Sequence, residues 1–347
     1  MFKYIEIKSV LKKLIDDHEA HYKLPSRNEI IKQYGVSDIT VRKALEELLR
    51  EGLIYSHHGK GSFVAPKKKE FLEVYNVMQG TDVKRRMDRS GWYFPLVEEL
   101  EAALEKYEME MTISFYKRNE DLERQILERL LQKNSYGIIF YYSGYESNIP
   151  YYKKVIEINP NVVFVDRCIE GINANYVGTD NISSSKALAM EVCKEKLDKV
   201  YVIDIEGWGK TNVSFERQKG FAEILKKKNQ KYEVLSSERS YYDDLPKIRE
   251  YVKNDLCKYE RVGFLCINSF MFKDVYEVCK EELNEKKKVM IGCYERPDII
   301  LENNMTLAWG RQNISKIAEI TVELIKANSK EYKKIYVPAE IIKENFS

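Results

Sequence analysis

The chain is poor in the residues that most often carry metal and redox chemistry. Its 347 residues include four histidines and six cysteines, and every cysteine comes after residue 167. No two cysteines form a CxxC pair, and most lie in apolar runs such as "GFLCI". Cysteines in such runs are typical of buried, reduced thiols. We therefore expect no disulfide framework, no metal and no cofactor.

Long apolar stretches are also missing. No run approaches the ~20 residues that a bilayer-spanning helix needs, and the first residues are charged where a secretion signal would be apolar. The sequence also lacks a G-x-x-x-x-G-K-[ST] phosphate loop and any pattern typical of a catalytic triad. We therefore expect a cytoplasmic protein that has no membrane partner and is not an enzyme.

The composition is that of a globular protein, with 44% hydrophobic and 32% charged residues. A chain of this length is expected to fold into two or three domains. Charge is divided unevenly along it. Residues 1–69 hold 14 Lys and Arg against 9 Asp and Glu, whereas the remainder holds 43 against 46. The small basic N-terminal piece favours an anionic partner for that part of the chain.

Residues 1–64 have the pattern of three helices and a hairpin. Ser26 and Glu29 stand in the S-x-x-E spacing of a capping box, and Gly35 is suited to a left-handed C-cap. Ser37 predicts the N-cap of the next helix. The apolar face of that helix consists of Val41, Ala44, Leu45, Leu48 and Leu49. Two short helices joined by a tight turn predict a helix-turn-helix.

The stretch "YSHHGKGSFV", residues 55–64, admits several interpretations. A phosphate loop is excluded, because Ile54 stands where its first glycine should be and Lys60 is followed by glycine. Zinc lacks ligands, because His57 and His58 are adjacent and point apart, with no cysteine nearby. A hairpin tip gives acid–base catalysis neither a third group nor a cleft. Between the β-prone runs "LIY" and "SFV", the stretch predicts the wing of a winged helix.

From Phe71 onward, strand-like apolar runs alternate with amphipathic helical stretches. The strand candidates are "VYNVM", "MTISFY", "YGIIFYY", "NVVFVD", "KVYVIDI", "RVGFLCI" and "KKVMIGC". The helical candidates include "FPLVEELEAALEKY", "LERQILERLLQK", "ERQKGFAEILKKK" and "DVYEVCKEEL". This alternation predicts an α/β fold with mostly parallel sheets, and about 275 residues are enough for two similar lobes.

Two known families are similar to these two parts. "LPSRNEIIKQYGVSDITVRKALEELLREGLIYSHHGKGSFV" resembles the winged-helix DNA-binding domain of the GntR family. The body resembles the effector domain of LacI/GalR repressors, which is similar to a periplasmic sugar-binding protein. The pieces that carry this second resemblance are "NVVFVDR", "VGTDNISSSKALAMEV", "SFERQKGFAEIL", "RVGFLCINS" and "VMIGCYE". Such a head on such a body resembles the AraR subgroup of arabinose repressors.

The resemblance implies a domain plan. A winged helix-turn-helix domain is expected over residues 1–66 and a linker over residues 67–72. Residues 73–347 are expected to form a two-lobed, periplasmic-binding-protein-like α/β domain for effector binding and dimerisation. The chain is expected to cross between its lobes near residues 178, 309 and 335.

A helix that lies in the major groove presents its N-terminal side chains to base edges. In the second helix of the helix-turn-helix these are Ser37, Asp38, Thr40 and Arg42. The resemblance adds positions in the preceding helix and in the wing, namely Arg27, Asn28, His58 and Gly59. Lys60 is placed at the wing tip to meet a phosphate.

Two of these positions leave alternatives open. At Asp38 many family members carry arginine. This carboxylate either accepts a hydrogen bond from cytosine N4 or only complements the N-terminus of its helix. Arg42 either contacts DNA or forms an ion pair with Glu46 one turn later. We favour DNA for Arg42, because arginine contacts to guanine and phosphate dominate such interfaces.

Ligands of two-lobed α/β proteins bind at the carboxyl ends of strands, so polar and aromatic residues that follow strands are effector-site candidates. They are Trp92, Tyr93, Tyr141, Asp166 and Arg167. Core packing is an equal alternative for the first two. The resemblance implies a sugar-clamping role for Arg217, whose alternative is the solvated face of a helix. It also implies roles for Asn268, Glu295 and Arg311.

The sequence therefore predicts a repressor that binds double-stranded, palindromic operator DNA as a homodimer. A small carbohydrate, L-arabinose or a related sugar, is expected to control it. A nucleoside, nucleobase or amino acid as effector stays open, since a fold does not fix its ligand. An α/β enzyme or solute-binding protein with an unrelated basic head is the alternative from another class.

Overall fold

The structure is a computed structural model of the chain. It describes residues 3–57, 59–66, 70–76, 92–116, 119–133, 135–205, 212–237, 249–250, 252–254, 256, 258–267, 269–282, 287–297, 299–302, 304–329 and 331–345. The chain divides into two compact units. We call Met1–Lys69 the head and Glu70–Ser347 the body.

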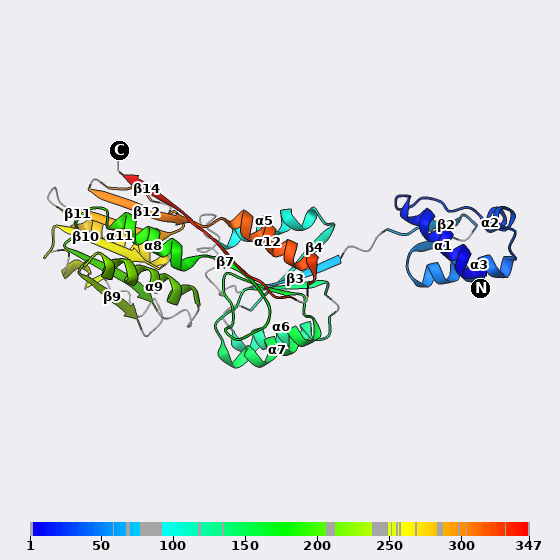
Figure 1. The fold of residues 1–347 in the computed structure, drawn as a ribbon, viewed down its shortest axis with the longest axis horizontal. Coiled ribbons are helices and arrows are strands. Elements are labelled where there is room, and N and C mark those ends of the chain that lie inside the picture. Colours follow the sequence, from blue (N-terminus) through cyan, green and yellow to red (C-terminus); the bar gives the residue numbers. More distant parts are fainter. Residues whose placement is uncertain are drawn as a thin grey trace. The chain divides into compact units, whose positions relative to one another are not determined.

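The head consists of three helices followed by an antiparallel hairpin (Figure 1). Its elements are α1 (Lys3–Asp16), α2 (Arg27–Tyr34), α3 (Asp38–Arg50), β1 (Ile54–His57) and β2 (Gly61–Val64). The capping box is present, because Ser26 accepts a hydrogen bond from the Glu29 backbone N–H and the Glu29 carboxylate accepts one from the Ser26 backbone N–H. Gly35 ends α2 at φ 61°, and Ser37 caps α3. The predicted helix-turn-helix is confirmed.

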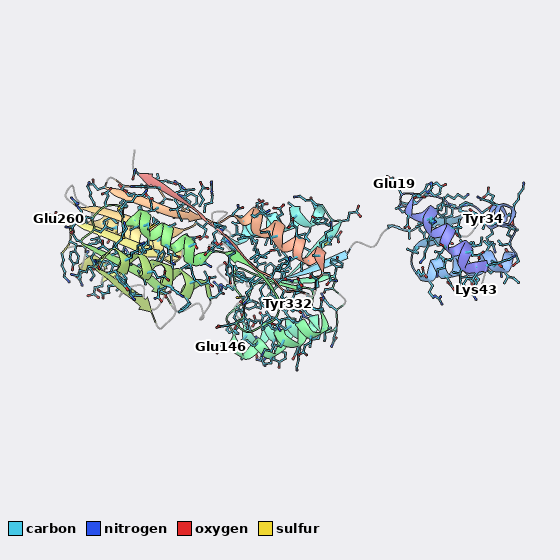
Figure 2. The ribbon with its side chains drawn as sticks, viewed as in Figure 1. Glu19, Tyr34, Lys43, Glu146, Glu260 and Tyr332 are labelled. Atoms are coloured by element: carbon cyan, nitrogen blue, oxygen red, sulfur yellow. The ribbon has the colours of Figure 1, made fainter. Side chains whose placement is uncertain are left out.

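An apolar core joins the helices of the head to its hairpin. Val41, Ala44 and Leu48 of α3 are completely buried in this core. The prediction that Leu49 also faces the core is wrong, because its side chain is 40% exposed. Successive residues of an α-helix point about 100° apart, so the residue after Leu48 turns out of the core. Polar residues such as Lys43 lie at the surface of the head (Figure 2).

The first lobe of the body is built on a six-stranded sheet in the order β13-β7-β6-β5-β3-β4. All neighbouring strands in it are parallel. The strands are β3 (Glu70–Asn76), β4 (Met109–Phe115), β5 (Gly137–Phe140), β6 (Val162–Val165), β7 (Asn175–Thr179) and β13 (Lys334–Val337). Residues 70–72, which the sequence assigned to the linker, therefore belong to a strand.

Helices cover both faces of this first sheet. They are α5 (Tyr93–Glu105), α6 (Glu120–Leu130), α7 (Ile149–Ile158) and α12 (Ile314–Ala327), with a 3-10 turn, η1 (Glu146–Asn148), before α7. Side chains alternate along the strands, so neighbouring residues join different cores. Ile139 packs in the cluster that contains α5 and α12, whereas Ile138 packs in the cluster that contains α6 and α7.

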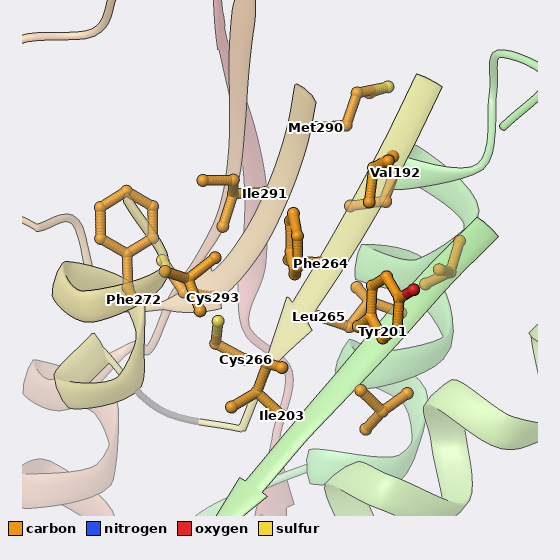
Figure 3. Packing of buried hydrophobic residues seen from close by; sticks show 14 of the residues in the cluster. Val192, Tyr201, Ile203, Phe264, Leu265, Cys266, Phe272, Met290, Ile291 and Cys293 are labelled. Atoms are coloured by element: carbon orange, nitrogen blue, oxygen red, sulfur yellow. The ribbon is translucent and has the colours of Figure 1, made fainter. Parts of the chain in front are cut away.

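The second lobe has its own six-stranded sheet in the order β14-β12-β11-β10-β8-β9. Only β14 is antiparallel to its neighbour in this sheet. The elements of the lobe are β8 (Lys199–Ile205), β9 (Tyr232–Ser237), β10 (Arg261–Cys266), β11 (Lys288–Tyr294), β12 (Met305–Arg311), β14 (Glu340–Asn345), α8 (Asn181–Val192), α9 (Asn212–Lys227) and α11 (Ser269–Glu282). In Figure 3, Phe264, Leu265 and Cys266 of β10 pack among side chains of the neighbouring strands and of α8 and α11.

Along the described elements the chain passes between the two lobes three times. It leaves the first lobe at Asp180, between β7 and α8, and returns through residues 312–313, between β12 and α12. It then crosses again through residues 338–339, between β13 and β14. Each passage is at most two residues long.

Among the helices that the structure describes, none carries an apolar stretch long enough to cross a membrane.

Candidate functional site

The N-termini of α2 and α3 bring three charged side chains together. Arg27 is the first residue of α2, Asp38 is the first residue of α3, and Arg42 follows one turn later. The Asp38 carboxylate lies 3.1 Å from Nη2 of Arg42 and 3.9 Å from Nη1 of Arg27. Arg42 therefore pairs one turn back, and the alternative of a pair with Glu46 is wrong. An acid one turn before its base is the better orientation on a helix, and Asp38 also lies near Arg27 and the positive end of the helix dipole.

This corner of the head remains accessible. The side chains of Arg27 and Arg42 are 54% and 58% exposed, and Asn28 is exposed beside them. The Ser37 hydroxyl is engaged with Thr40, through Oγ1 at 2.9 Å and the backbone N–H at 3.3 Å. These two residues mainly hold the start of the helix, whereas the arginines keep N–H groups for an external partner.

One large apolar side chain is also exposed at this corner, and the sequence analysis missed it. Ile39, the second residue of α3, is 78% exposed, whereas Val41 two residues later is completely buried. The helical pattern itself held the signal, because position 39 falls outside the apolar face of α3. An isoleucine in this place can make apolar contact with a thymine methyl group.

The wing ends in a tight turn made by two glycines. Gly59 has φ 75° and Gly61 has φ 108°, both in the left-handed region that favours glycine. Lys60 lies between them, is exposed, and donates its backbone N–H to the His57 carbonyl. His58 lies outside the described residues. The turn thus presents one positive charge and unhindered backbone at its tip.

In the body, aromatic and charged side chains gather where β5 and β6 end. Tyr141 follows β5, and Asp166 and Arg167 follow β6. The guanidinium carbon of Arg167 lies 4.9 Å from the ring centroid of Tyr141, and its Nε lies 3.6 Å from the Asp166 carboxylate. The ring of Trp92 lies 5.7 Å from that of Tyr141. Within the described part of the chain, the buried Nε1 of Trp92 and Nε of Arg167 have no hydrogen-bond acceptor.

The second lobe contributes Arg217, which is 4% exposed on α9. Its Nε donates to Oδ1 of Asn181 at 2.8 Å, and its Nη1 donates to the Ile267 carbonyl at 2.8 Å. The guanidinium carbon stacks 3.5 Å from the ring centroid of Tyr294, the last residue of β11. The alternative of a solvated position for Arg217 is therefore wrong. The helix α9 packs against α8, and the side chain of Arg217 reaches the Ile267 carbonyl and the Tyr294 ring, so it is removed from water.

Glu295 and Gln312 complete the cluster from the ends of β11 and β12. The Gln312 amide donates to the Glu295 carboxylate, and the Thr179 hydroxyl hydrogen-bonds to the Gln312 carbonyl oxygen. Thr179 ends β7 in the first lobe, so this chain of hydrogen bonds joins residues of both lobes. We call the set of Trp92, Tyr141, Asp166, Arg167, Arg217, Glu295 and Gln312 the polar cluster.

Two carboxylates of the polar cluster lie on left-handed backbone. Asp166 has φ 64° and Glu295 has φ 56°, which is uncommon for residues with a side chain. Backbone strain of this kind concentrates at ligand-binding sites. Burial raises the pKa of both carboxyl groups, and the positive charge of Arg217 opposes that rise. The two lobes thus each present one carboxylate, the buried Asp166 and the half-buried Glu295, to a shared arginine.

The polar cluster combines strong donors with strong acceptors in a small space. Such a set is suited to hold a small molecule that carries several hydroxyl groups. No group of three or more His, Cys, Asp or Glu residues that fits a metal ion was found among the described residues.

Comparison with known families agrees with this division. The model of "Bacterial regulatory proteins, gntR family" matches residues 3–64. The model "Periplasmic binding protein domain" matches residues 87–326. The chain belongs to the periplasmic binding protein domain family. Its body is the domain of that family, and a gntR-family helix-turn-helix head precedes it.

The relatives of this periplasmic binding protein family member match only part of the chain. The chain is 27% identical over 168 residues to the arabinose metabolism transcriptional repressor of Halalkalibacterium halodurans, which is 47% of this chain and 44% of that relative. It is 39% identical over 91 residues to the probable fructoselysine utilization operon transcriptional repressor of Escherichia coli, which is 23% of this chain and 37% of that relative. The matched part thus spans less than half the length of each relative.

Solved structures of similar fold include transcriptional regulators whose descriptions name a sugar. A probable maltose operon transcriptional repressor from Staphylococcus aligns with a TM-score of 0.65 at 12% identity, over 80% of this chain and 97% of that one. A transcriptional regulator in complex with cellobiose aligns with a TM-score of 0.63 at 14% identity, over 89% and 91% of the two chains. At this identity the likeness shows the fold alone.

The periplasmic binding protein fold brings together most of the residues that the sequence selected for an effector, but not all of them. Arg311 is exposed and pairs with Glu340, away from the polar cluster. The next residue, Gln312, takes the buried position instead. Tyr93 begins α5, but its side chain lies outside the described residues, as does Asn268.

The position of Trp92 agrees with the core-packing alternative from the sequence. The Trp92 side chain packs against the apolar core of the first lobe and also lies beside Tyr141. The sequence analysis missed Gln312 and Asn181, each of which comes within two residues of a strand end. Both are neutral amides, and their position just after a strand is the signal that could have found them.

Proposed function

We propose that the protein is a homodimeric transcriptional repressor that binds palindromic operator DNA through its heads. A small neutral carbohydrate, with L-arabinose as the first candidate, binds at the polar cluster and lowers the affinity for the operator. The observation that carries the proposal is that one chain joins an accessible cationic helix-turn-helix to a body whose buried polar groups converge from two lobes.

The head supports the DNA half of the proposal. Arg27 and Arg42 are exposed at the start of α2 and α3, where a helix in the major groove presents side chains to base edges. Lys60 at the wing tip supplies a charge for phosphate. Ile39 supplies an apolar contact for a thymine methyl group. One head covers a single half-site, and two heads on a palindrome double the contact surface.

The polar cluster supports the effector half. Arg167 and Arg217 offer N–H donors, Asp166 and Glu295 accept hydrogen bonds from hydroxyl groups, and Trp92 offers a flat apolar ring for the C–H face of a sugar. The match of 168 residues to an arabinose repressor is longer than the head, so it includes part of the body. This makes L-arabinose the first sugar to test.

The connections between the lobes support a coupling mechanism. A sugar at the polar cluster would touch residues of both lobes and favour one arrangement of them over another. Coupling free energies between two sites are typically about 1–3 kcal/mol, which is a change of about 5–150-fold in affinity, and the coupling is reciprocal. Operator DNA should therefore weaken sugar binding by the same factor.

The test uses the full-length chain and DNA duplexes that it selects from a random pool. Fluorescence anisotropy measures its affinity for a selected duplex with L-arabinose, other pentoses, hexoses or nucleosides. We expect one of the sugars to weaken binding by about 5–150-fold. The same sugar at ~100 times its Kd should stabilise the body by about 2.7 kcal/mol in thermal unfolding. A response to nucleosides alone would replace the carbohydrate with another effector.

Two neighbouring substitutions make a matched control for the site. Gln312→Ala should abolish the sugar response, because Gln312 links Glu295 to Thr179 inside the polar cluster. Arg311→Ala should leave it unchanged, because Arg311 is exposed and pairs with Glu340. If no sugar alters the operator affinity of the wild type, the sensor half of the proposal fails. If the chain selects no duplex at all, the DNA half fails.

A further inference from the structure

We propose that Asp38 is a positioning residue for DNA recognition. Its carboxylate holds Arg27 and Arg42 in the orientation in which they read the operator, and it makes no base contact itself. The inference rests on the proposed DNA-binding function and adds to it the residue that sets sequence specificity through its neighbours.

The geometry of the carboxylate separates its two oxygens between two partners. Oδ2 faces Nη2 of Arg42 at 3.1 Å, and Oδ1 faces Nη1 of Arg27 at 3.9 Å. Arg42 belongs to the same helix as Asp38, one turn later, whereas Arg27 begins the preceding helix. One carboxylate thereby lies between two guanidinium groups from the two helices, hydrogen-bonded to Arg42 and at ion-pair distance from Arg27.

This arrangement argues against a direct base contact by Asp38. A cytosine N4 amino group would have to displace one of the two arginines from the carboxylate before it could donate to it. Phosphates around the groove also repel a bare carboxylate, whereas a carboxylate held between two arginines adds to a group of net positive charge. The two arginines are the groups that gain from approaching DNA.

The arrangement also favours specificity over simple attraction. An exposed arginine samples many rotamers, and binding costs the entropy of fixing them. A carboxylate one turn earlier restricts Arg42 before DNA arrives, while the side chain stays 58% exposed and its guanidinium keeps N–H groups for a guanine edge. Bidentate recognition depends on this fixed direction, whereas attraction to phosphate depends only on charge.

The experiment measures a specificity ratio, which is the affinity for a duplex selected by the wild-type chain divided by the affinity for a scrambled duplex. Full-length Asp38→Ala should lower this ratio by about 10-fold, the value of one well-formed base contact. Its affinity for the scrambled duplex should stay the same or rise, since a negative charge is lost. Circular dichroism confirms that the variant is folded.

Glu46→Ala is the matched control. Glu46 is exposed on the same helix, and among the interactions that the structure describes it contacts neither arginine. Its replacement by alanine removes the same negative charge. Glu46→Ala should change the affinity for both duplexes equally and leave the specificity ratio unchanged. If Asp38→Ala behaves in the same way, Asp38 acts only by charge and the proposal is wrong.

A mutant cycle that treats the two arginines as one unit separates positioning from direct contact. In a chain that carries both Arg27→Ala and Arg42→Ala, the further change Asp38→Ala should no longer lower the specificity ratio, because the groups that Asp38 positions are gone. Asp38→Ala and Arg42→Ala should also relax base preference at the same position of the selected site. If Asp38→Ala still lowered the specificity ratio fully in the chain without Arg27 and Arg42, and also removed the preference for a cytosine at another position, Asp38 would contact a base directly. Failure of the wild-type chain to select any duplex would instead refute DNA binding itself.

Discussion

Replacement of Arg217 by methionine tests the energetic role of the polar cluster. Arg217 is 4% exposed and donates two hydrogen bonds of 2.8 Å, to Asn181 and to the Ile267 carbonyl. Arg217→Met preserves the packing against Tyr294 but removes the charge and both donors. Removal of one partner from a buried charged network costs about 3–5 kcal/mol, because the remaining groups stay buried and unpaired. We therefore expect the free energy of unfolding of the body to fall by about this amount.

The measurement is urea unfolding of the full-length chain followed by tryptophan fluorescence. All three tryptophans, at positions 92, 208 and 309, belong to the body, so the signal does not report on the head. Lys219→Met is the matched control, since this exposed residue lies on the same helix. It should change stability by no more than about 0.5 kcal/mol.

The pH dependence of the Arg217→Met penalty follows from the two carboxylates. Burial raises the folded-state pKa of Asp166 and Glu295. The free energy of unfolding is therefore greatest when both groups are protonated, and it falls as pH rises from their unfolded pKa through their folded pKa. The positive charge of Arg217 limits this fall. Without it the penalty should be larger at pH 8 than at pH 5. A loss below about 1 kcal/mol at pH 8, or one that grows on acidification, would refute the reasoning.

Three further outcomes are expected in the head. Lys60→Ala should weaken binding to all DNA sequences alike and reduce the slope of log affinity against log salt by about 1, as measured by anisotropy titrations; an unchanged slope would remove the wing tip from the interface. Ile39→Ala should bind a selected duplex more weakly than the wild type does. Deoxyuridine in place of the contacted thymine should weaken wild-type binding by the same factor and should not weaken binding of the variant any further. Additive losses would contradict the methyl contact. Lys12 and Lys8 lower the pKa of Glu51 to about 2, so its contribution to stability is present above the ordinary carboxyl pKa and disappears as pH falls towards 2. Glu51→Gln should therefore lower stability at pH 7 and flatten acid unfolding of the head followed by circular dichroism, and an unchanged acid profile would contradict this.

Local signals made the head predictable. Ser26 and Glu29, Gly35 and Ser37 each act on backbone groups within four residues, so spacing alone identifies them. The partner of Arg42 was not predictable in the same way. Asp38 and Glu46 stand one turn before and one turn after it, and spacing alone does not separate them. An acid on the N-terminal side of the base is the better orientation, and Asp38 also lies 3.9 Å from Arg27 of another helix.

The body was predictable at its strand ends and less so elsewhere. Asp166 was found because the carboxyl ends of parallel strands meet at one edge of a sheet, whereas Glu295 was found through the family resemblance. Arg311 was chosen where Gln312 belongs, which is a shift of one residue. Alternating side chains of a strand face opposite sides, so that shift exchanges a buried position for an exposed one. Without the register of β12, the sequence could not distinguish them.

The three passages between the lobes have a consequence for synthesis of the chain. The sheet and helices of the first lobe are incomplete until α12 and β13 have been made, and these follow nearly the whole second lobe. At ~5–20 residues per second, the ribosome needs roughly 10–30 s to reach them after β7. During that time Val163 and Val177, which pack in the same cluster as α12, lack this cover. The nascent first lobe therefore exposes an apolar face that a chaperone can bind until α12 and β13 have been made.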